Sequence, residues 1–195
     1  LWTYSAIQKP VPYVYCSDGY YILGGLGVLA PSGVGQPFFA RTYPNLRTHN
    51  VIFFSLTYYV LNSWDPNDYI QLKFGASPTM NVGNTLVNSR YYESLYCPGG
   101  GSVVRNVRIF GSVQNSETNL YIQVISQSDE SNTNEAFGIR EFNTFYVQSA
   151  SPPADTICTT GPDGVTTSIQ CACGEGYYYA SGACQPCDPS CGSCY

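Results

Sequence analysis

The chain carries little charge: Asp, Glu, Lys and Arg make up only 11% of its 195 residues. Ordinary soluble domains contain about 25% of these residues, so neutral groups, among them 18 Tyr and 19 Gly, supply much of the polarity. Such a surface is more typical of a protein that contacts carbohydrate or other subunits than of a monomeric cytosolic protein. The 8 Lys and Arg residues are scattered and the net charge is −5. We therefore expect no nucleic-acid partner, because no cationic stripe could neutralise phosphates.

The chain also has only one histidine and no long apolar run. The single histidine, His49, is the residue that a Ser-His-Asp or Cys-His arrangement would have to use. It lies at the entrance to an expected strand, where a hydrogen-bonded structural His is more frequent, so the sequence does not predict an enzyme. No apolar run approaches the roughly 20 residues of a membrane-spanning helix. Leu1 opens without a signal-peptide pattern, and we expect a mature N-terminus or a fragment edge there.

Alternating apolar residues are present, most clearly from Val51 to Phe74. The even positions from 52 to 60 are all apolar, as in a strand with one buried face, and the alternation resumes after an Asp/Pro/Asn turn. We expect a hairpin of two long strands at the centre of the domain. The inward residues of these strands and of a strand over 120–125 predict the core: Ile52, Phe54, Leu56, Ile70, Leu72, Leu120, Ile122 and Val124.

Further strands are expected over 38–43, 103–113 and 137–147, the last with a β-bulge near Arg140 and Glu141. Residues 76–88 are expected to form a long connection, and Gly24, Gly25 and Gly27 are interpreted as bulge or close-packing glycines. Many strands and no helices predict an all-β fold, an antiparallel β-sandwich of jelly-roll type over residues 1–148. A Pro/Ser linker over 149–157 and a small disulfide-rich region over 158–195 follow.

Nine cysteines place the chain outside the cell or in the secretory lumen. Cys16 and Cys97 lie alone in the sandwich and are expected to form one disulfide, with reactive-thiol chemistry as the less favoured alternative. Zinc binding by the tail is disfavoured by the compartment and by the lack of nearby His. Because seven tail cysteines cannot all pair with one another, we expect a longer chain or a thiol from a partner. These seven are Cys158, Cys171, Cys173, Cys184, Cys187, Cys191 and Cys194.

Aromatic and acidic residues near the expected loops are the candidate binding groups. Flat rings can stack on sugars, and the candidates are Trp64, Tyr69, Tyr91 and Tyr92. The alternative for Trp64 is a lid over the core. Two acidic groups, Asp65 with Asp68 and Asp129 and Glu130 with Glu135, could coordinate calcium or act as glycosidase carboxylates. Turn capping is the favoured role for such Asp residues, so no cofactor is expected and calcium is the alternative.

Residues 1–15 begin with an alternating piece that contains Trp2 and Tyr4. The Pro10 and Pro12 pair that follows prevents pairing as a central strand. We favour an arm or edge strand that lies on its own domain. The alternative is donation of this arm to the exposed sheet edge of a neighbouring subunit.

The tail cysteines carry two resemblances. Cys171-Ala-Cys173-Gly-Glu-Gly176-Tyr177 with Cys184 resembles the end of an EGF-like module, and Cys187, Cys191 and Cys194 resemble the start of a furin-like repeat. The EGF-like resemblance implies one disulfide between Cys158 and Cys171 and another between Cys173 and Cys184. Both modules are incomplete in this chain.

A wider resemblance covers nearly the whole chain. It rests on Cys16-x2-Gly19-Tyr20, Phe39-x-Arg41-Thr42-Tyr43, His49-Asn50-x-Ile52, Asn62-Ser63-Trp64-Asp65 and the run from Asn134 to Phe142. This series resembles modular secreted or surface proteins of ciliates and related microbial eukaryotes. Asn62 and Phe137 stand where the family pattern has Asp and Trp, and the first change removes an acidic calcium ligand.

These observations together favour a structural role. We expect a subunit of an extracellular coat or filament that assembles with identical copies. The chain lacks a plausible catalytic constellation, and few charges keep its copies apart. A carbohydrate-binding surface module is the alternative function, with glycans as its partners.

Overall fold

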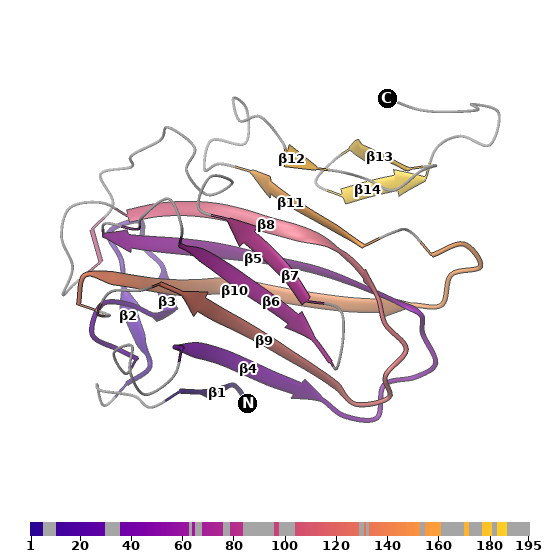
Figure 1. Ribbon diagram of the computed structural model, residues 1–195, viewed down its shortest axis with the longest axis horizontal. Coiled ribbons are helices and arrows are strands. Elements are labelled where there is room, and N and C mark those ends of the chain that lie inside the picture. Colours follow the sequence, from indigo (N-terminus) through magenta and orange to yellow (C-terminus); the bar gives the residue numbers. More distant parts are fainter. Residues whose placement is uncertain are drawn as a thin grey trace.

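The computed structural model describes residues 1–5, 11–29, 36–62, 64, 68–75, 79–83, 96–97, 104–128, 131, 133–152, 155–160, 170–171, 177–180 and 183–186. Every regular element within these ranges is a β-strand (Figure 1). The same ranges contain no helix of the length and apolarity needed to cross a membrane.

Two antiparallel sheets pack face to face as a sandwich (Figure 1). The first sheet has the order β1 (Thr3–Tyr4), β4 (Phe38–Tyr43), β9 (Leu120–Gln127), β6 (Tyr69–Phe74) and β7 (Thr79–Gly83). The second has the order β12 (Gln170–Cys171), β11 (Thr156–Thr160), β8 (Val104–Gln114), β5 (Val51–Asn62), β10 (Glu135–Val147), β3 (Tyr21–Gly24) and β2 (Tyr13–Tyr15). In the tail, β13 (Tyr177–Ala180) pairs with β14 (Ala183–Pro186).

The core between the sheets is filled by alternate residues of the long strands. All eight residues predicted for it are buried in one cluster, which confirms that prediction: Ile52, Phe54, Leu56, Ile70, Leu72, Leu120, Ile122 and Val124. Burying each such side chain contributes about 2 kcal/mol. This gain fixes which face of each strand turns inward, because a slip of one residue would move the whole set into solvent.

The prediction of a central hairpin was wrong. β5 pairs with β8 and β10 in the seven-stranded sheet, whereas β6 pairs with β7 and β9 in the five-stranded sheet. The chain therefore crosses from one sheet to the other between Asn62 and Tyr69. Alternation of apolar residues reveals the buried face of a strand but not its hydrogen-bonded neighbours, so the two arrangements have the same sequence pattern.

Two other local predictions had opposite outcomes. Residues 76–88 were expected to be a connection, but Thr79–Gly83 forms β7, an edge strand that pairs with β6. An edge strand needs only one row of backbone hydrogen bonds, and a short polar segment can supply it. The bulge in β10 is confirmed, because the register with β5 shifts between Arg140 and Asn143 and Glu141 has a φ of 53°.

β5 is buried on both faces over part of its length, whereas the sequence suggested one buried face. Tyr59 and Leu61 point away from the sandwich core, yet both are fully buried. They belong to a second apolar cluster with Ile22, Leu26 and Ala136, which also contains both cysteines of the sandwich. The Cys16–Cys97 disulfide is present, as predicted, and it closes the chain over this outer face of β5.

The seven-stranded sheet continues into the cysteine-rich region. β11 begins at Thr156, inside the expected linker, and pairs along β8 from Thr156 to Thr160. β12 then pairs with β11 so that the backbone of Cys171 lies opposite that of Cys158. This register is compatible with the pairing that the EGF-like resemblance implies.

Candidate binding surface at the β2–β3 hairpin and the β10 edge

The hairpin of β2 and β3 forms one edge of the seven-stranded sheet. Its turn is built by Asp18 and Gly19: the Asp18 carboxylate accepts a hydrogen bond from the Tyr20 backbone N–H at 3.1 Å, and Gly19 has a φ of 87°. The Cys16 backbone N–H donates to the Tyr20 carbonyl at 2.8 Å. An Asp-Gly pair supplies the positive φ that such turns require.

Four tyrosines of this hairpin are exposed. The exposed fractions of Tyr13, Tyr15, Tyr20 and Tyr21 are 48%, 51%, 49% and 63%. Tyr15 and Tyr21 are direct cross-strand partners, and their ring centroids lie 4.9 Å apart. Tyr13 contacts Tyr21 edge to face at 5.5 Å. Aromatic side chains gathered in this way form a continuous apolar surface that ends in hydroxyl groups.

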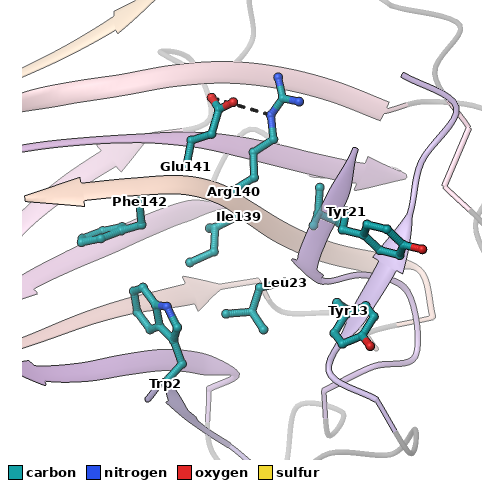
Figure 2. Close-up of a pocket in the computed structure, with 9 residues that line it drawn as sticks. Trp2, Tyr13, Tyr21, Leu23, Ile139, Arg140, Glu141 and Phe142 are labelled. Atoms are coloured by element: carbon teal, nitrogen blue, oxygen red, sulfur yellow. Dashed lines mark ion pairs between the residues drawn. The ribbon is translucent and has the colours of Figure 1, made fainter. Parts of the chain in front are cut away.

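A groove of about 340 Å³ lies beside the hairpin, between the edges of the two sheets (Figure 2). Trp2 enters it from the end of β1 and packs edge to face on Phe142 of β10, with ring centroids 5.2 Å apart. Leu23 and Ile139 form the floor, and Tyr13 and Tyr21 lie at the far end. Figure 2 shows that Arg140 and Glu141 point to the other side of β10, so the side chains within the groove are mainly aromatic and aliphatic.

The edge of β10 beyond its bulge is open. β3 pairs with β10 only at Gly138 and Ile139, and no described strand pairs with residues 142–147 on that side. This stretch, Phe-Asn-Thr-Phe-Tyr-Val, contains no charged residue and no proline. Phe145, Tyr146 and Val147 are 59%, 40% and 37% exposed. Apolar side chains thus occur along one edge together with backbone groups that pair with no described strand on that side.

Behind the groove, a polar cluster joins the hairpin turn to β5 and β10. The Arg140 guanidinium lies 3.6 Å from the centroid of the Tyr20 ring, a cation–π distance, and 4.0 Å from the Asp18 carboxylate. It also lies 4.0 Å from the Glu141 carboxylate, which accepts a hydrogen bond from Thr57 at 3.2 Å. The buried Nε and Nη1 atoms of Arg140 have no hydrogen-bond partner among the described residues.

The phenol of Tyr59 completes this cluster by donating a short hydrogen bond to Asp18. Burial raises the pKa of Tyr59 above its ordinary value, the hydrogen bond to Asp18 raises it further, and the charge of Arg140 lowers it by less. Tyr59 therefore stays neutral and acts as a hydrogen-bond donor. The cluster thus anchors the turn of the tyrosine-rich hairpin to the two central strands.

Trp64 is not exposed for stacking on sugars, because it lies 6% exposed in the sandwich core. Its Nε1–H donates to the Ala136 carbonyl at 3.0 Å, and its ring meets Tyr58 edge to face at 6.0 Å. Trp64 therefore has the alternative role considered from the sequence, that of a lid over the core. The reason is its indole N–H, which finds an acceptor at the start of β10 and so can be buried at little cost.

The other predicted binding residues do not come together in the described part of the chain. Tyr69 is half-buried on β6, and Tyr91 and Tyr92 lie outside the described residues. Asp68 and Glu135 are buried at 3% and 2% exposure, while Asp65, Asp129 and Glu130 lie outside the described residues. Within the described ranges, no three His, Cys, Asp or Glu side chains are placed to hold a metal ion.

Of the tail cysteines, Cys158, Cys171 and Cys184 lie on described strands. Cys173, Cys187, Cys191 and Cys194 lie outside the described residues. The arm residues lie in their own domain: Tyr4 is paired opposite Phe39 on β4, and Trp2 packs against the core. This is the arrangement that the sequence favoured over donation of the arm.

His49 is buried beside the start of β5. Its Nδ1 lies 2.7 Å from the Arg47 carbonyl and so carries the proton, and its ring packs on Tyr146 at 5.2 Å. The Nε2 atom is buried without a hydrogen-bond partner among the described residues. The next residue, Asn50, accepts from the Ser149 backbone N–H at 2.8 Å and donates to the Ser149 carbonyl at 2.7 Å. His49 and Asn50 therefore fix the end of β10.

Sequence reasoning missed the surface on which the exposed tyrosines gather. The signal was present in Tyr-Val-Tyr-Cys-Ser-Asp-Gly-Tyr-Tyr, residues 13–21, because Asp-Gly between two short apolar pieces is a hairpin pattern. A hairpin across this turn brings Tyr15 opposite Tyr21. The groove had no such signal, since Trp2 and Phe142 meet only through the packing of the two sheets.

Comparison with known proteins gives no match: no family model fits the chain, and no curated protein or solved structure is significantly similar to it.

Proposed function

We propose that the chain is a subunit of an extracellular assembly, a surface coat or filament on a microbial eukaryote, whose identical copies associate through the open edge of β10. The observation that carries the proposal is the edge over residues 142–147, which is uncharged and exposes Phe145, Tyr146 and Val147. Natural sheets usually protect an exposed edge with charges, proline or a covering segment. An edge without these devices favours pairing with another strand.

The electrostatics of the edge favour an identical partner. A contact between two copies brings like charges together, and the whole chain carries a net charge of −5. The segment 142–147 is neutral, so this contact avoids the repulsion that such a net charge would otherwise cause. Pairing would bury the exposed ring of Phe145, and full burial of such a side chain is worth roughly 2 to 3 kcal/mol.

The compartment and the finer architecture belong to the same proposal. The Cys16–Cys97 disulfide supports an oxidising environment. The strand order β8-β5-β10-β3 in one sheet and β4-β9-β6-β7 in the other supports assignment to the jelly-roll type, which has eight strands in two sheets. We assign the tail to an EGF-like module followed by the start of a furin-like repeat on its cysteine spacing alone.

The contact in this proposal does not use the N-terminal arm. β1 pairs with β4 of its own chain, and moving it to a neighbour would expose the apolar contact between Trp2 and Phe142. We therefore propose that the edge of β10 accepts or pairs with a strand, while the arm stays in its own domain.

Sedimentation velocity over a range of protein concentrations tests this contact. Phe145→Lys places a charge on the edge and should weaken self-association by at least about tenfold. Tyr96→Lys is the matched control, because Tyr96 is 53% exposed and its backbone is hydrogen-bonded to Ser17, not to the edge over residues 142–147. Equal association of the two variants would contradict a contact through β10.

Carbohydrate binding is the second candidate function, and the aromatic groove is the observation that favours it. Trp2, Tyr13 and Tyr21 line a preformed hollow next to exposed hydroxyl groups, and sugars bind to such surfaces by stacking. A glycan array with the unaltered chain, Tyr21→Ala and Tyr96→Ala would decide. Binding that Tyr21→Ala removes and Tyr96→Ala keeps would support this function, and an array without signal would exclude it.

A further inference from the structure

The β2–β3 hairpin holds two tyrosines in position to react with each other. Tyr15 and Tyr21 lie directly opposite on the paired strands, and their ring centroids are 4.9 Å apart with an interplanar angle of 55°. The rings are about half exposed and nearly two-thirds exposed. Neither hydroxyl group makes a hydrogen bond to the described part of the chain. Both phenols are therefore accessible from solution.

We propose that Tyr15 and Tyr21 are an oxidative cross-linking site, which a haem peroxidase with hydrogen peroxide converts to dityrosine. The oxidised enzyme takes one hydrogen atom from each phenol and leaves two phenoxyl radicals. The radicals join by a carbon–carbon bond between ring positions next to the hydroxyl groups, and the two ring hydrogens move to the oxygens. Overall, two phenols and one hydrogen peroxide give one biphenol and two waters.

Among the described residues, the ring contacts between two tyrosines are Tyr15–Tyr21 and Tyr13–Tyr21, and the first is the closer. Tyr58 and Tyr59 are buried, and the Tyr20 ring is covered by the Arg140 guanidinium. Tyr13 contacts Tyr21 edge to face at 5.5 Å and is the second partner for the same ring. Because the hairpin holds the rings together, coupling within one chain has a much higher effective concentration than coupling between chains in dilute solution.

The cross-link would add a covalent bond to the outermost hairpin of the sheet. This hairpin contains Cys16, so the new bond and the Cys16–Cys97 disulfide would lie side by side along the chain. A carbon–carbon bond survives reduction, which a disulfide does not. The inference rests on the proposed function only for the extracellular setting in which peroxide and peroxidases meet the chain.

The test treats dilute full-length chain with a haem peroxidase and hydrogen peroxide, then measures dityrosine fluorescence, intact mass and cross-linked peptides. We expect a monomer that has lost two hydrogen atoms and a peptide that joins residues 15 and 21. Tyr21→Phe removes the phenol hydroxyl that both ring pairs share and should lower the yield on the order of tenfold. Tyr15→Phe should leave a slower product that joins residues 13 and 21.

Tyr96→Phe is the matched control, since Tyr96 is as exposed as Tyr15 but has no aromatic ring contact among the described residues. It should leave the yield unchanged. Equal yields from Tyr21→Phe and Tyr96→Phe, or products that join only separate chains, would overturn the proposal. The reaction takes place within a monomer, so a failure to form the cross-link would not contradict the assembly proposal. Likewise, isolated monomers in native material would contradict assembly but not the cross-link.

Discussion

Tyr58 and Tyr59 are neighbours in the sequence, and their phenol groups lie on opposite faces of β5. Tyr58 is fully buried in the sandwich core, where its ring stacks on Phe137 and its hydroxyl group has no hydrogen-bond partner among the described residues. Tyr59 is equally buried on the outer face, but its hydroxyl group donates to Asp18. The same side chain is therefore unsatisfied at one position and satisfied at the next.

We predict opposite effects of removing the two hydroxyl groups. Tyr58→Phe should raise the free energy of unfolding by about 1 kcal/mol, because it removes a hydroxyl group that loses its hydrogen bonds to water on folding. Tyr59→Phe should lower it by about 2 kcal/mol, because the lost hydrogen bond has a charged acceptor. Urea unfolding followed by tryptophan fluorescence checks both values. A loss of stability in Tyr58→Phe as large as in Tyr59→Phe would contradict this description of β5.

Alkaline pH provides a second prediction at these residues. Burial is the largest cause that raises the folded-state pKa of both Tyr58 and Tyr59, whereas an unfolded Tyr has a pKa of about 10. Stability from the two neutral phenols is therefore fully present below about pH 10 and is lost as the pH rises above it. Each of the two phenols should lower the free energy of unfolding by about 1.4 kcal/mol for each pH unit above about pH 10.

The free energy of unfolding measured from pH 9 to 12 checks this. Tyr58→Phe should remove one of the two contributions and give a shallower decline than the unaltered chain. An unchanged slope in that variant would contradict the assignment of Tyr58 as a buried, neutral phenol.

Single residues also show where sequence reasoning reaches its limit. Leu56 and Leu72 could be assigned to the core because alternation alone identifies an inward face. The burial of Tyr59 and Leu61 could not, because it depends on Ile22, Leu26 and the Cys16–Cys97 disulfide, which are distant in the sequence and pack on the outer face. For Trp64, burial depended on one acceptor, the Ala136 carbonyl, which lies 72 residues away.

At the scale of elements, the strands were easier to predict than their partners. The extent of β10 and its bulge followed from a change of phase between Phe137 and Phe142. The separation of β5 and β6 into different sheets did not follow, because a hairpin and a crossover between sheets bury the same alternate residues. β7 was missed since its pairing uses backbone groups, which the sequence pattern does not encode.

The contact between β3 and β10 gives a prediction at this scale. Gly24 has a φ of 109°, and an added Cβ would lie 2.4 Å from the Phe137 carbonyl oxygen. Gly24→Ala should therefore cost about 3 kcal/mol, the sum of backbone strain and overpacking. Gly19→Ala is the control, because its φ is also positive but the nearest atom is 3.9 Å away. It should cost about 1 kcal/mol.

Thermal and urea unfolding of these two variants measure the difference. Equal losses would mean that β3 does not approach β10 as closely as described. Such a result would also remove the support for the groove, since Leu23 and Ile139 form its floor where these strands meet.

At the scale of the whole molecule, the Cys16–Cys97 disulfide links positions 81 residues apart. The double variant Cys16→Ser/Cys97→Ser should lose on the order of 4 kcal/mol in the chain-entropy model. Cys16→Ser alone should lose nearly as much, because either change opens the same loop. Urea unfolding under non-reducing conditions measures the loss, and a value below about 1 kcal/mol would contradict a disulfide that constrains the unfolded chain.

The molecule as described has one sandwich core, one cluster beneath the disulfide and one uncharged open edge. The sandwich core could be predicted from the alternation of apolar residues, and the disulfide from the position of the two cysteines. The open edge could not be foreseen, because it exists only where β3 leaves β10 after Ile139. The proposed assembly depends on this last feature.

Electron microscopy of the native material shows directly whether the chain assembles with its own copies outside the cell. We expect connected particles with a regular repeat, in which neighbouring sandwiches meet along β10. Isolated monomers in the native material would contradict it.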